Sequence, residues 1–150
     1  MLKTIGVAGA LALAMLASGS RPAHADFSAC DSAFQAKDIH QKIDLYSSCL
    51  KRGGLQRSDV AGAFNNRGIA YEQLGETDKA LQDFISASQY DPSWPDFRIN
   101  RAEAEASKGQ CAEAQADVGL ALKLAPHRKT LLELRDRLAA SCPIVSKPPS

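Results

Sequence analysis

The sequence has few of the features that mark enzymes, metal proteins or β-sheet proteins. No stretch alternates apolar and polar residues for long enough to predict a strand. No cysteine belongs to a CxxC or CxxH pair of the kind that binds zinc. No serine or cysteine lies in a nucleophile-elbow or Cys-His motif. We therefore expect no catalytic residue, no metal site and no cofactor, and a protein that is not an enzyme.

The chain also lacks an excess of charge of either sign. It has 18 Lys and Arg against 17 Asp and Glu, a formal net charge of +1. Without the segment 1–25, which contains Lys3 and Arg21, the balance is 18 − 2 = 16 basic against 17 acidic side chains, or −1. A balance so close to zero gives no electrostatic reason to expect nucleic acid or an anionic membrane as partner.

The segment 1–25 predicts a secretory signal. A short basic start precedes the apolar stretch Ile5–Ala17, and Ala23 and Ala25 are small residues at the positions that signal peptidase reads, so we expect cleavage before Asp26. The apolar stretch, with about 13 residues, is too short to cross a bilayer core of roughly 30 Å as a stable helix. An uncleaved anchor is the alternative.

What the sequence does have is a helix-hairpin pattern that occurs twice, at 63–92 and again at 97–126. The positions that recur in step are Gly68 with Ala102, Gly75 with Gly109, Ala80 with Ala114, Ala87 with Ala121, and Pro92 with Pro126. A period of about 34 residues with this punctuation resembles the tetratricopeptide repeat (TPR). The resemblance covers about residues 27–141 and implies an all-α fold, an α-solenoid of antiparallel helix hairpins that serves protein–protein interaction. The second copy departs from the pattern, with Glu105 in place of Tyr71 and Val118 in place of Phe84.

Beyond the leader, about 125 residues remain, enough for one domain. We expect a helical domain over residues 26–142, with a divergent repeat at 27–60, clear repeats at 61–94 and 95–128, a capping helix at 128–141, and a disordered Pro-rich tail at 143–150. The predicted helices are 27–36, 39–51, 60–74, 78–90, 93–107, 111–124 and 128–140, with N-caps expected at Ser58 or Asp59 and at Thr77.

The repeat pattern also predicts how the helices pack. Gly68 and Ala102 are expected where paired helices cross, because a larger side chain would force the axes apart. The residues expected to fill the space between repeats are Tyr71, Leu74, Leu81 and Phe84 in the first copy and Leu120, Leu122 and Leu124 in the second. We expect Trp94 and Phe97 to be packed in the same way rather than to contact a ligand.

Four cysteines follow the leader, and an even number in an exported protein favours disulfides. Their spacing alone leaves three pairings open. The arrangement that the resemblance implies places Cys30 and Cys49 on one hairpin, and Cys111 beside Cys142 on neighbouring antiparallel helices. It therefore implies the bridges Cys30–Cys49 and Cys111–Cys142.

In TPR proteins the first helices of successive pairs line a concave groove that holds an extended peptide. Carried over residue by residue, the groove would be lined by Asn65, Asn66, Ile69 and Glu72 from one repeat and by Ile99, Asn100, Glu103 and Ala106 from the next. Asn66 and Asn100 are equivalent, and a carboxamide can bond to a peptide backbone without reading its side chains. The alternative is that these asparagines bridge local backbone.

Two further motifs bear on the groove. The carboxylate clamp of some family members is not expected, because Asn65, Ile69, Thr130 and Leu134 stand where its basic residues would be needed beside Asn100. Arg67 and Arg101, which are equivalent in the two copies, either add positive charge near the groove or pair with an acidic residue of an adjacent helix or turn. We favour the second role, with Asp91 as one candidate partner.

These features predict an interaction module that binds a peptide or helix of another exported protein. An Asn-Asn-Arg-Gly start to the repeat is common in small exported TPR proteins of Gram-negative bacteria, and this resemblance implies a periplasmic location, without membrane insertion after cleavage. The alternatives are a self-associating envelope protein, monomer or weak dimer, with apolar surface at Phe27 and Phe34, and an enzyme with an unrecognised site. We expect His40 and His127 to be solvated.

Overall fold

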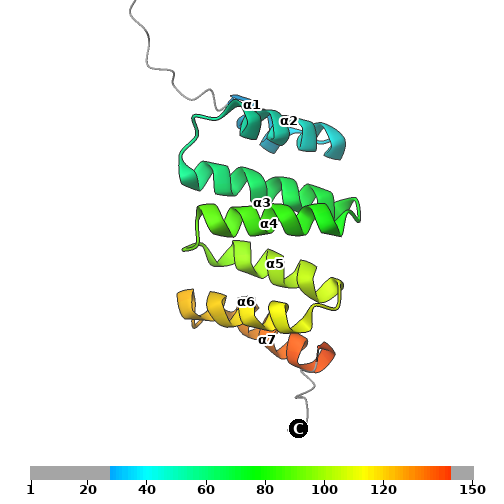
Figure 1. The fold of residues 1–150 in the computed structure, drawn as a ribbon, viewed down its shortest axis with the longest axis vertical. Coiled ribbons are helices and arrows are strands. Elements are labelled where there is room, and N and C mark those ends of the chain that lie inside the picture. The colour runs from blue at the N-terminus through cyan, green and yellow to red at the C-terminus, as the bar shows by residue number, and fades with distance from the viewer. Residues whose placement is uncertain (1–27, 143–150) are drawn as a thin grey trace, which may run out of the picture.

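The computed structural model describes residues 28–142, and this part of the chain consists of α-helices without a strand. The helices are α1 (Ser28–Gln35), α2 (Ile39–Arg52), α3 (Arg57–Gln73), α4 (Thr77–Tyr90), α5 (Pro95–Ser107), α6 (Cys111–Leu124) and α7 (Lys129–Ser141). Figure 1 shows them stacked along the long axis, with α1 and α7 at opposite ends. The predicted leader and the predicted tail lie outside the described residues.

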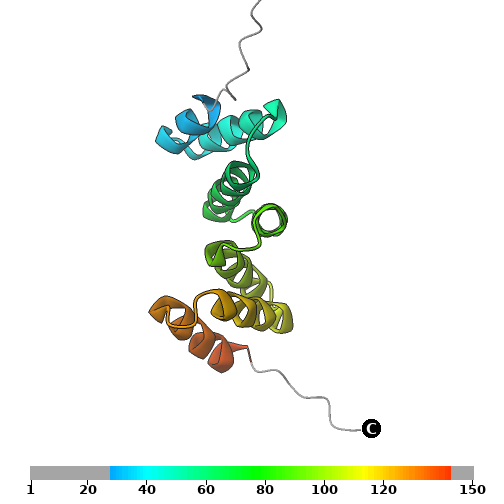
Figure 2. The same cartoon turned by 90° about the vertical axis from the view of Figure 1, so that its left-hand side faces the viewer.

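The helices form hairpins that stack as a solenoid. α1 pairs with α2, α3 with α4 and α5 with α6, and α7 packs on α6 at the end of the stack. In the side view of Figure 2, α1, α3 and α7 lie toward one side and α2 and α4 toward the other. The all-α solenoid predicted from the repeat period is confirmed.

The repeated glycines end the first helix of each clear repeat. Gly75 and Gly109 both have φ of +73°, in the left-handed region that other residues adopt only at a cost. The amide after each glycine donates to a carbonyl near the end of the helix, that of Tyr71 in one repeat and of Glu105 in the other, at 2.9 Å in both. The two turns therefore have the same geometry, which is that of a Schellman helix end.

The helices α3 and α4 begin earlier than the predicted N-cap residues imply. α3 begins at Arg57, so Ser58 and Asp59 lie inside it, and Thr77 is the first residue of α4. The residues in the cap positions make no side-chain hydrogen bond to these helices. The early start of α3 has a tertiary reason, because the Arg57 guanidinium donates to carbonyls at the C-terminal end of α4, including that of Tyr90 at 3.3 Å. The predicted caps are wrong.

Gly68 lies where α3 crosses α4. A Cβ at this position would meet the ring of Phe84 at 2.7 Å and the carbonyl oxygen of Ala80 at 3.2 Å, so the crossing requires glycine. The equivalent residue Ala102 is fully buried and packs with Val118, which replaces the phenylalanine. The smaller Val118 explains why the second repeat has room for a methyl group where the first has none.

The core is a row of small clusters along the stack, as expected for a solenoid in which each repeat contacts only its neighbours. The clusters are Ala33, Tyr46, Cys49 and Ala63; Ala61, Ala87 and Phe97; Ala80, Phe84 and Ala104; and Ala102, Ala114, Val118, Leu134 and Leu138. Tyr71, Leu81 and Leu122 are partly buried against these clusters. Their predicted packing role is confirmed, as is that of Phe97.

Three packing predictions are wrong. Trp94 is 55% exposed because it lies in the turn before α5. Leu120 and Leu124 are 40% and 45% exposed. Neither is among the buried residues of α6, which are Ala114, Asp117, Val118 and Ala121, so the apolar character of a side chain did not by itself predict that it is buried.

Arg67 and Arg101 each join three helices. Arg67 donates to both carboxylate oxygens of Asp83 at 2.7 Å and to the Ser47 hydroxyl at 3.0 Å. Arg101 makes the corresponding bidentate pair with Asp117, and it donates to a serine hydroxyl of α4 at 3.1 Å. Because each guanidinium bonds to its own hairpin and to the preceding one, the structural role is the one observed. The expected partner Asp91 is wrong.

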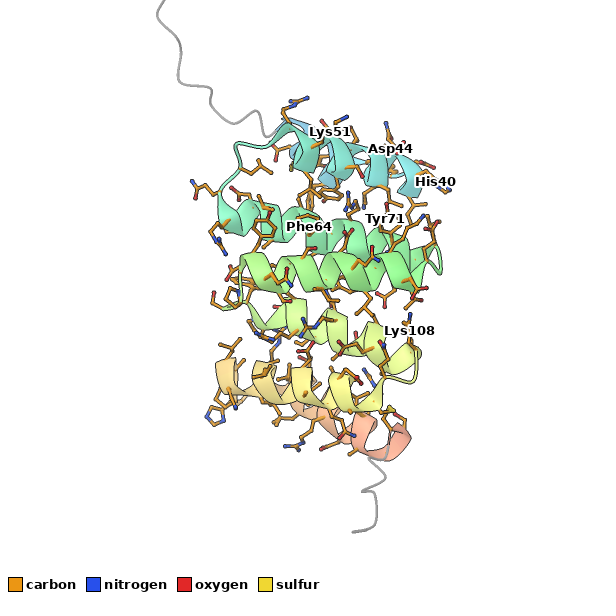
Figure 3. All side chains as sticks on the ribbon, viewed as in Figure 1. His40, Asp44, Lys51, Phe64, Tyr71 and Lys108 are labelled. Carbon is orange, nitrogen blue, oxygen red and sulfur yellow. A yellow bond between two sulfur atoms is a disulfide. The ribbon has the colours of Figure 1, made fainter. Side chains whose placement is uncertain are left out.

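Aromatic rings surround the first of these arginines. The Arg67 guanidinium lies 5.5 Å from the ring centroid of Phe64 and 5.8 Å from that of Tyr71, and both rings project from α3 (Figure 3). Hydrogen bonding to Asp83 is the main reason that the Arg67 pKa is raised, with burial acting in the opposite direction. The Arg67 guanidinium is therefore charged, and its position is fixed by hydrogen bonds to Asp83 and Ser47 and by contacts with two aromatic rings.

The cysteines form two disulfides, Cys30–Cys49 and Cys111–Cys142, the pairs that the hairpin arrangement implies. Their Cα–Cα distances are 5.4 and 5.2 Å, within the usual range. The first ties α1 to α2 at the start of the stack, and the second ties the start of α6 to the end of α7. Gln115 reinforces the second link by donating to the Cys142 carbonyl at 2.6 Å.

Candidate binding groove

A hollow between α1, α2 and α3 lies at the N-terminal end of the predicted groove. It consists of two pockets, of about 270 and about 280 Å³, which share Phe34, Tyr46 and Asn66 in their lining. We call it the Phe34 hollow. Phe34 is 71% exposed, whereas Tyr46 is only 3% exposed. The predicted groove residue Ile69 lines the second pocket, so the hollow continues onto the surface of α3.

The structure links the predicted asparagines to one another. Asn100 donates to the Asn65 side-chain oxygen at 2.7 Å, which connects α5 to α3. Asn65 is 9% exposed and in turn donates to Asn66 at 3.4 Å. Asn66 bonds to the Tyr46 hydroxyl, whose pKa is raised mainly by burial. Side chains rather than local backbone are therefore their partners, and Asn65 lies beneath the surface that Asn66 and Asn100 present.

The predicted groove residues also include two carboxylates. Glu72 on α3 and Glu103 on α5 are both exposed. The protein around the Glu72 carboxyl still removes part of its water, and this desolvation raises its pKa, with the charge of Glu103 raising it further. Arg137 of α7 donates to Glu103 at 2.6 Å. The pair therefore makes the middle of the groove acidic, with one of the two charges compensated.

The apolar groove residues have a mixed role. Ile69 and Ile99 are half-buried, and each packs against a core cluster, as does Ala106. Sequence reasoning identified the surfaces of α3 and α5 but did not assign Phe34 and Tyr46 to the groove. The first hairpin diverges from the repeat pattern, so no equivalent position was available to indicate them. The one signal in the sequence was Phe34 itself, a large apolar residue in the first hairpin, which was expected to leave apolar surface at the N-terminal end.

Glu105 is a buried carboxylate outside the groove. It is 7% exposed, and one of its oxygens has no hydrogen-bond partner. Arg101 approaches the other at 3.5 Å. Burial, followed by the charge of Asp117, raises the Glu105 pKa to about 7. An aromatic residue, Tyr71, occupies the same position in the first repeat, so the buried acid is peculiar to the second repeat.

No protein-family model matches the sequence, and no curated protein matches it. Solved structures do match. The TPR domain of Arabidopsis OM64 is 26% identical, with a TM-score of 0.64, over 75% of this chain and 90% of that one. The second TPR domain of human RPAP3, in complex with an HSP70 peptide, is 22% identical, with a TM-score of 0.67, over 76% and 94%.

A bacterial structure is also similar. The Yersinia enterocolitica type III secretion chaperone SycD, in complex with a peptide of the translocator YopD, is 20% identical, with a TM-score of 0.60, over 77% of this chain and 86% of that one. The residues described here therefore have the TPR fold, with three hairpins and a final helix. At these identities the likeness establishes the fold, and the chemistry of the groove has to be read from this chain's own residues.

Proposed function

We propose that the protein is a peptide-binding interaction module. Its site begins at the Phe34 hollow and continues along α3 and α5 past Asn66 and Asn100. The observation that carries this proposal is the exposed Phe34 ring beside two pockets whose floor is polar and fixed. A large apolar side chain that is mostly exposed is informative when it borders a hollow, because binding is one way to cover it. Several structures with the same fold hold peptides.

The hydrogen bonds among the asparagines order this surface before a ligand binds. Because Tyr46, Asn66, Asn65 and Asn100 are already joined by hydrogen bonds, the carboxamides do not have to be ordered when a ligand arrives. Asn66 and Asn100 can each still offer a donor or acceptor to a peptide backbone. A site that is ordered in advance loses less conformational entropy on binding.

Charge indicates the kind of peptide. The lining of the Phe34 hollow includes Asp31, Asp59 and one base, Lys42, and the carboxylates Glu72 and Glu103 follow along the groove. The human RPAP3 complex holds the HSP70 peptide SGPTIEEVD, which ends in Glu-Glu-Val-Asp. An acidic groove repels a peptide whose C-terminal end is negatively charged. We expect this groove to take an extended segment with an apolar side chain for the hollow and a Lys or Arg facing Glu72.

A displayed library of random peptides tests the proposal. Peptides selected on the purified wild type are expected to contain the apolar and basic pattern and to bind with dissociation constants of about micromolar, given the small area available. Phe34→Ser is expected to weaken their binding at least about tenfold, as for the loss of one buried aromatic contact. Trp94→Ser is the matched control, since it removes an aromatic that is 55% exposed and lies outside the hollow.

The outcome distinguishes the groove from other surfaces. Equal weakening by the two substitutions would show that exposed aromatics bind peptides without a specific site. Equal binding by wild type and Phe34→Ser would rule out the hollow, and failure to select any peptide would rule out the function. Circular dichroism of each variant checks that the helical fold is retained.

We further propose that the protein is exported to the periplasm after cleavage of the predicted leader. Two disulfides support an oxidising compartment. Among the described helices, none is long and apolar enough to span a membrane. Fractionation of cells that express the full sequence, followed by N-terminal sequencing, tests this. We expect a periplasmic chain that starts at Asp26, and a cytoplasmic chain that retains Met1 would contradict the proposal.

A further inference from the structure

An arginine recurs a third time at the period of the repeat. Arg135 of α7 follows Arg101 at the same spacing of 34 residues at which Arg101 follows Arg67. The first two guanidinium groups bond to an aspartate on the second helix of their own hairpin, Asp83 or Asp117. α7 packs on α6 as α5 packs on α4, but within the described part of the chain no second helix follows α7. Arg135 therefore occupies the place of a first-helix arginine without the helix that pairs with it.

The Arg135 side chain is correspondingly exposed. It is 52% exposed, against 18% for Arg67 and 20% for Arg101. Its carboxylate partner in the described structure is the next residue, Asp136, at 2.8 Å, and that side chain is itself 69% exposed. An ion pair between exposed neighbours contributes little, and a guanidinium has five N–H donors. Arg135 can therefore accept a second carboxylate.

An apolar pocket of about 260 Å³ lies beside this arginine, between α6 and α7. We call it the α7 pocket. Its lining includes Val118 and Gly119 of α6 and Leu138 of α7. The equivalents of the first two residues on α4 are Phe84 and Ile85. The pocket is therefore formed where α6 has smaller side chains than α4, and a Cβ at Gly119 would meet nothing within 4 Å.

The preceding repeat shows what covers this place in the fold. The Arg101 guanidinium lies between α4, α5 and α6, because it donates to Ser88 of α4 as well as to Asp117 of α6. The equivalent of Ser88 is Leu122, which lines the α7 pocket together with Arg135. The pocket and its arginine therefore mark the position that a second helix occupies in the earlier hairpins. In both of those hairpins that helix brings a carboxylate to the arginine.

Two features restrict what can occupy the position. Residues 143–150 contain no acidic side chain, so they do not supply an equivalent of Asp83. Asp136 stands at the position of Gly68 and Ala102, where the paired helices cross, and its side chain keeps an incoming helix further from α7. At that separation a glutamate reaches Arg135 better than the shorter aspartate does, and a large apolar side chain is needed to fill the pocket.

We propose that the α7 pocket and Arg135 bind a helix of another protein, one that carries a glutamate within one turn of a large apolar residue. This helix lies against α7 as α6 lies against α5. Its glutamate pairs with the guanidinium, and its apolar side chain fills the pocket. The surface is at the opposite end of the stack from the Phe34 hollow (Figure 1). It also has the opposite charge preference, so one chain can hold two different partners at once.

Selection from a displayed library of helical peptides tests the proposal, with the disulfide-bonded protein as the target. The selected peptides are expected to share a glutamate three or four positions from Leu, Met or Phe, the spacing that puts both side chains on one face. Arg135→Glu is expected to weaken their binding about tenfold or more, because it replaces an opposite charge with a like one. Lys129→Glu makes the same change of charge on α7, at a residue that is 88% exposed and outside the pocket. This control is expected to leave the affinity unchanged.

Charge exchange and filling of the pocket identify the contact. A selected peptide with its glutamate replaced by lysine is expected to lose affinity for wild type and to regain it for Arg135→Glu. Gly119→Leu is expected to weaken binding about tenfold, because its side chain takes the space of the partner's apolar residue. The open space at Gly119 allows this substitution without loss of the fold, which thermal unfolding checks. Phe34→Ser is expected to have no effect, so this proposal and that of the peptide groove can fail separately.

Four results would overturn the proposal. One is a selection in which no peptide responds to Arg135→Glu, which would mean that this end of the stack is simply solvated. Another is a set of peptides that bind the pocket without an acidic residue. The third is tighter binding after deletion of residues 143–150, which would make that segment the occupant. The fourth is self-association in sedimentation equilibrium that Arg135→Glu abolishes, which would assign the pocket to a second copy of the chain.

Discussion

The buried carboxylate of Glu105 predicts a stability that falls as pH rises. Its pKa is about 7 in the folded protein against an ordinary value of 4.5, so between these values the folded state binds more protons than the unfolded state. The free energy of unfolding therefore decreases with pH across this window and levels off above it. A difference of about 2.5 in pKa corresponds to about 3 kcal/mol.

Glu105→Gln isolates this contribution. Glutamine has nearly the same shape and cannot ionise, so it resembles the protonated acid. We expect the variant to match wild type within about 1 kcal/mol at pH 4.5 and to exceed it by about 3 kcal/mol at pH 8. Urea denaturation at a series of pH values measures the difference, in which the titration of other groups largely cancels. Arg101 keeps its bidentate partner Asp117 in both proteins.

A difference between variant and wild type that does not change with pH would refute the reasoning. It would mean that Glu105 ionises alike in the folded and unfolded states, and hence that its carboxylate is solvated or paired in solution. A variant that is less stable at pH 8 would refute it more strongly, because the Arg101 contact at 3.5 Å would then outweigh burial. Glu133→Gln, at an exposed position on α7, is the control and is expected to change stability by less than about 0.5 kcal/mol at either pH.

Three further predictions concern the framework. Reduction of the two disulfides, which join cysteines 19 and 31 apart in sequence, is expected to lower the free energy of unfolding by about 3 kcal/mol each; equal urea midpoints with and without reductant would contradict this. Gly68→Ala is expected to destabilise by about 1–3 kcal/mol, because its methyl group meets Phe84. Gly62→Ala, where a Cβ has open space, is expected to stabilise by about 0.5–1 kcal/mol, so the same sign for both would show that the crossing is not tight. Arg67→Met is expected to cost about 3 kcal/mol in thermal or urea unfolding by leaving Asp83 buried without a partner. Adding Asp83→Leu is expected to recover most of this loss, and failure to recover it would contradict the desolvation argument.

Much of the fold could be predicted from local sequence. Gly75 and Gly109 are the residues that tolerate positive φ, so the ends of α3 and α5 are local properties. The recurring hairpin pattern and the small residues at helix crossings likewise follow from one repeating unit, whereas the two cysteine pairs follow from the arrangement of hairpins that the family resemblance implies. The helix start at Arg57 was missed because its hydrogen-bond partners lie on α4 and are not local in sequence.

The candidate groove was predicted in outline. The surfaces of α3 and α5 follow from the repeat, which is why Asn66 and Asn100 could be named before the structure. The repeat could not show that Asn65 is buried between them. It also could not show that Phe34 borders the same surface, because the first hairpin has no equivalent position from which to carry a role over.

The sequence by itself determined that the chain forms stacked helix hairpins with paired cysteines, because helix periodicity, turn glycines and small crossing residues act within one repeat. Tertiary structure decided which polar groups meet. Only the stacking of repeats joins Arg67 to Asp83 and Ser47, excludes water from Glu105 and leaves Leu120 and Leu124 outside. The physical reason is that burial and hydrogen bonding depend on the neighbouring repeats, whereas helix formation depends mainly on side chains three or four positions away.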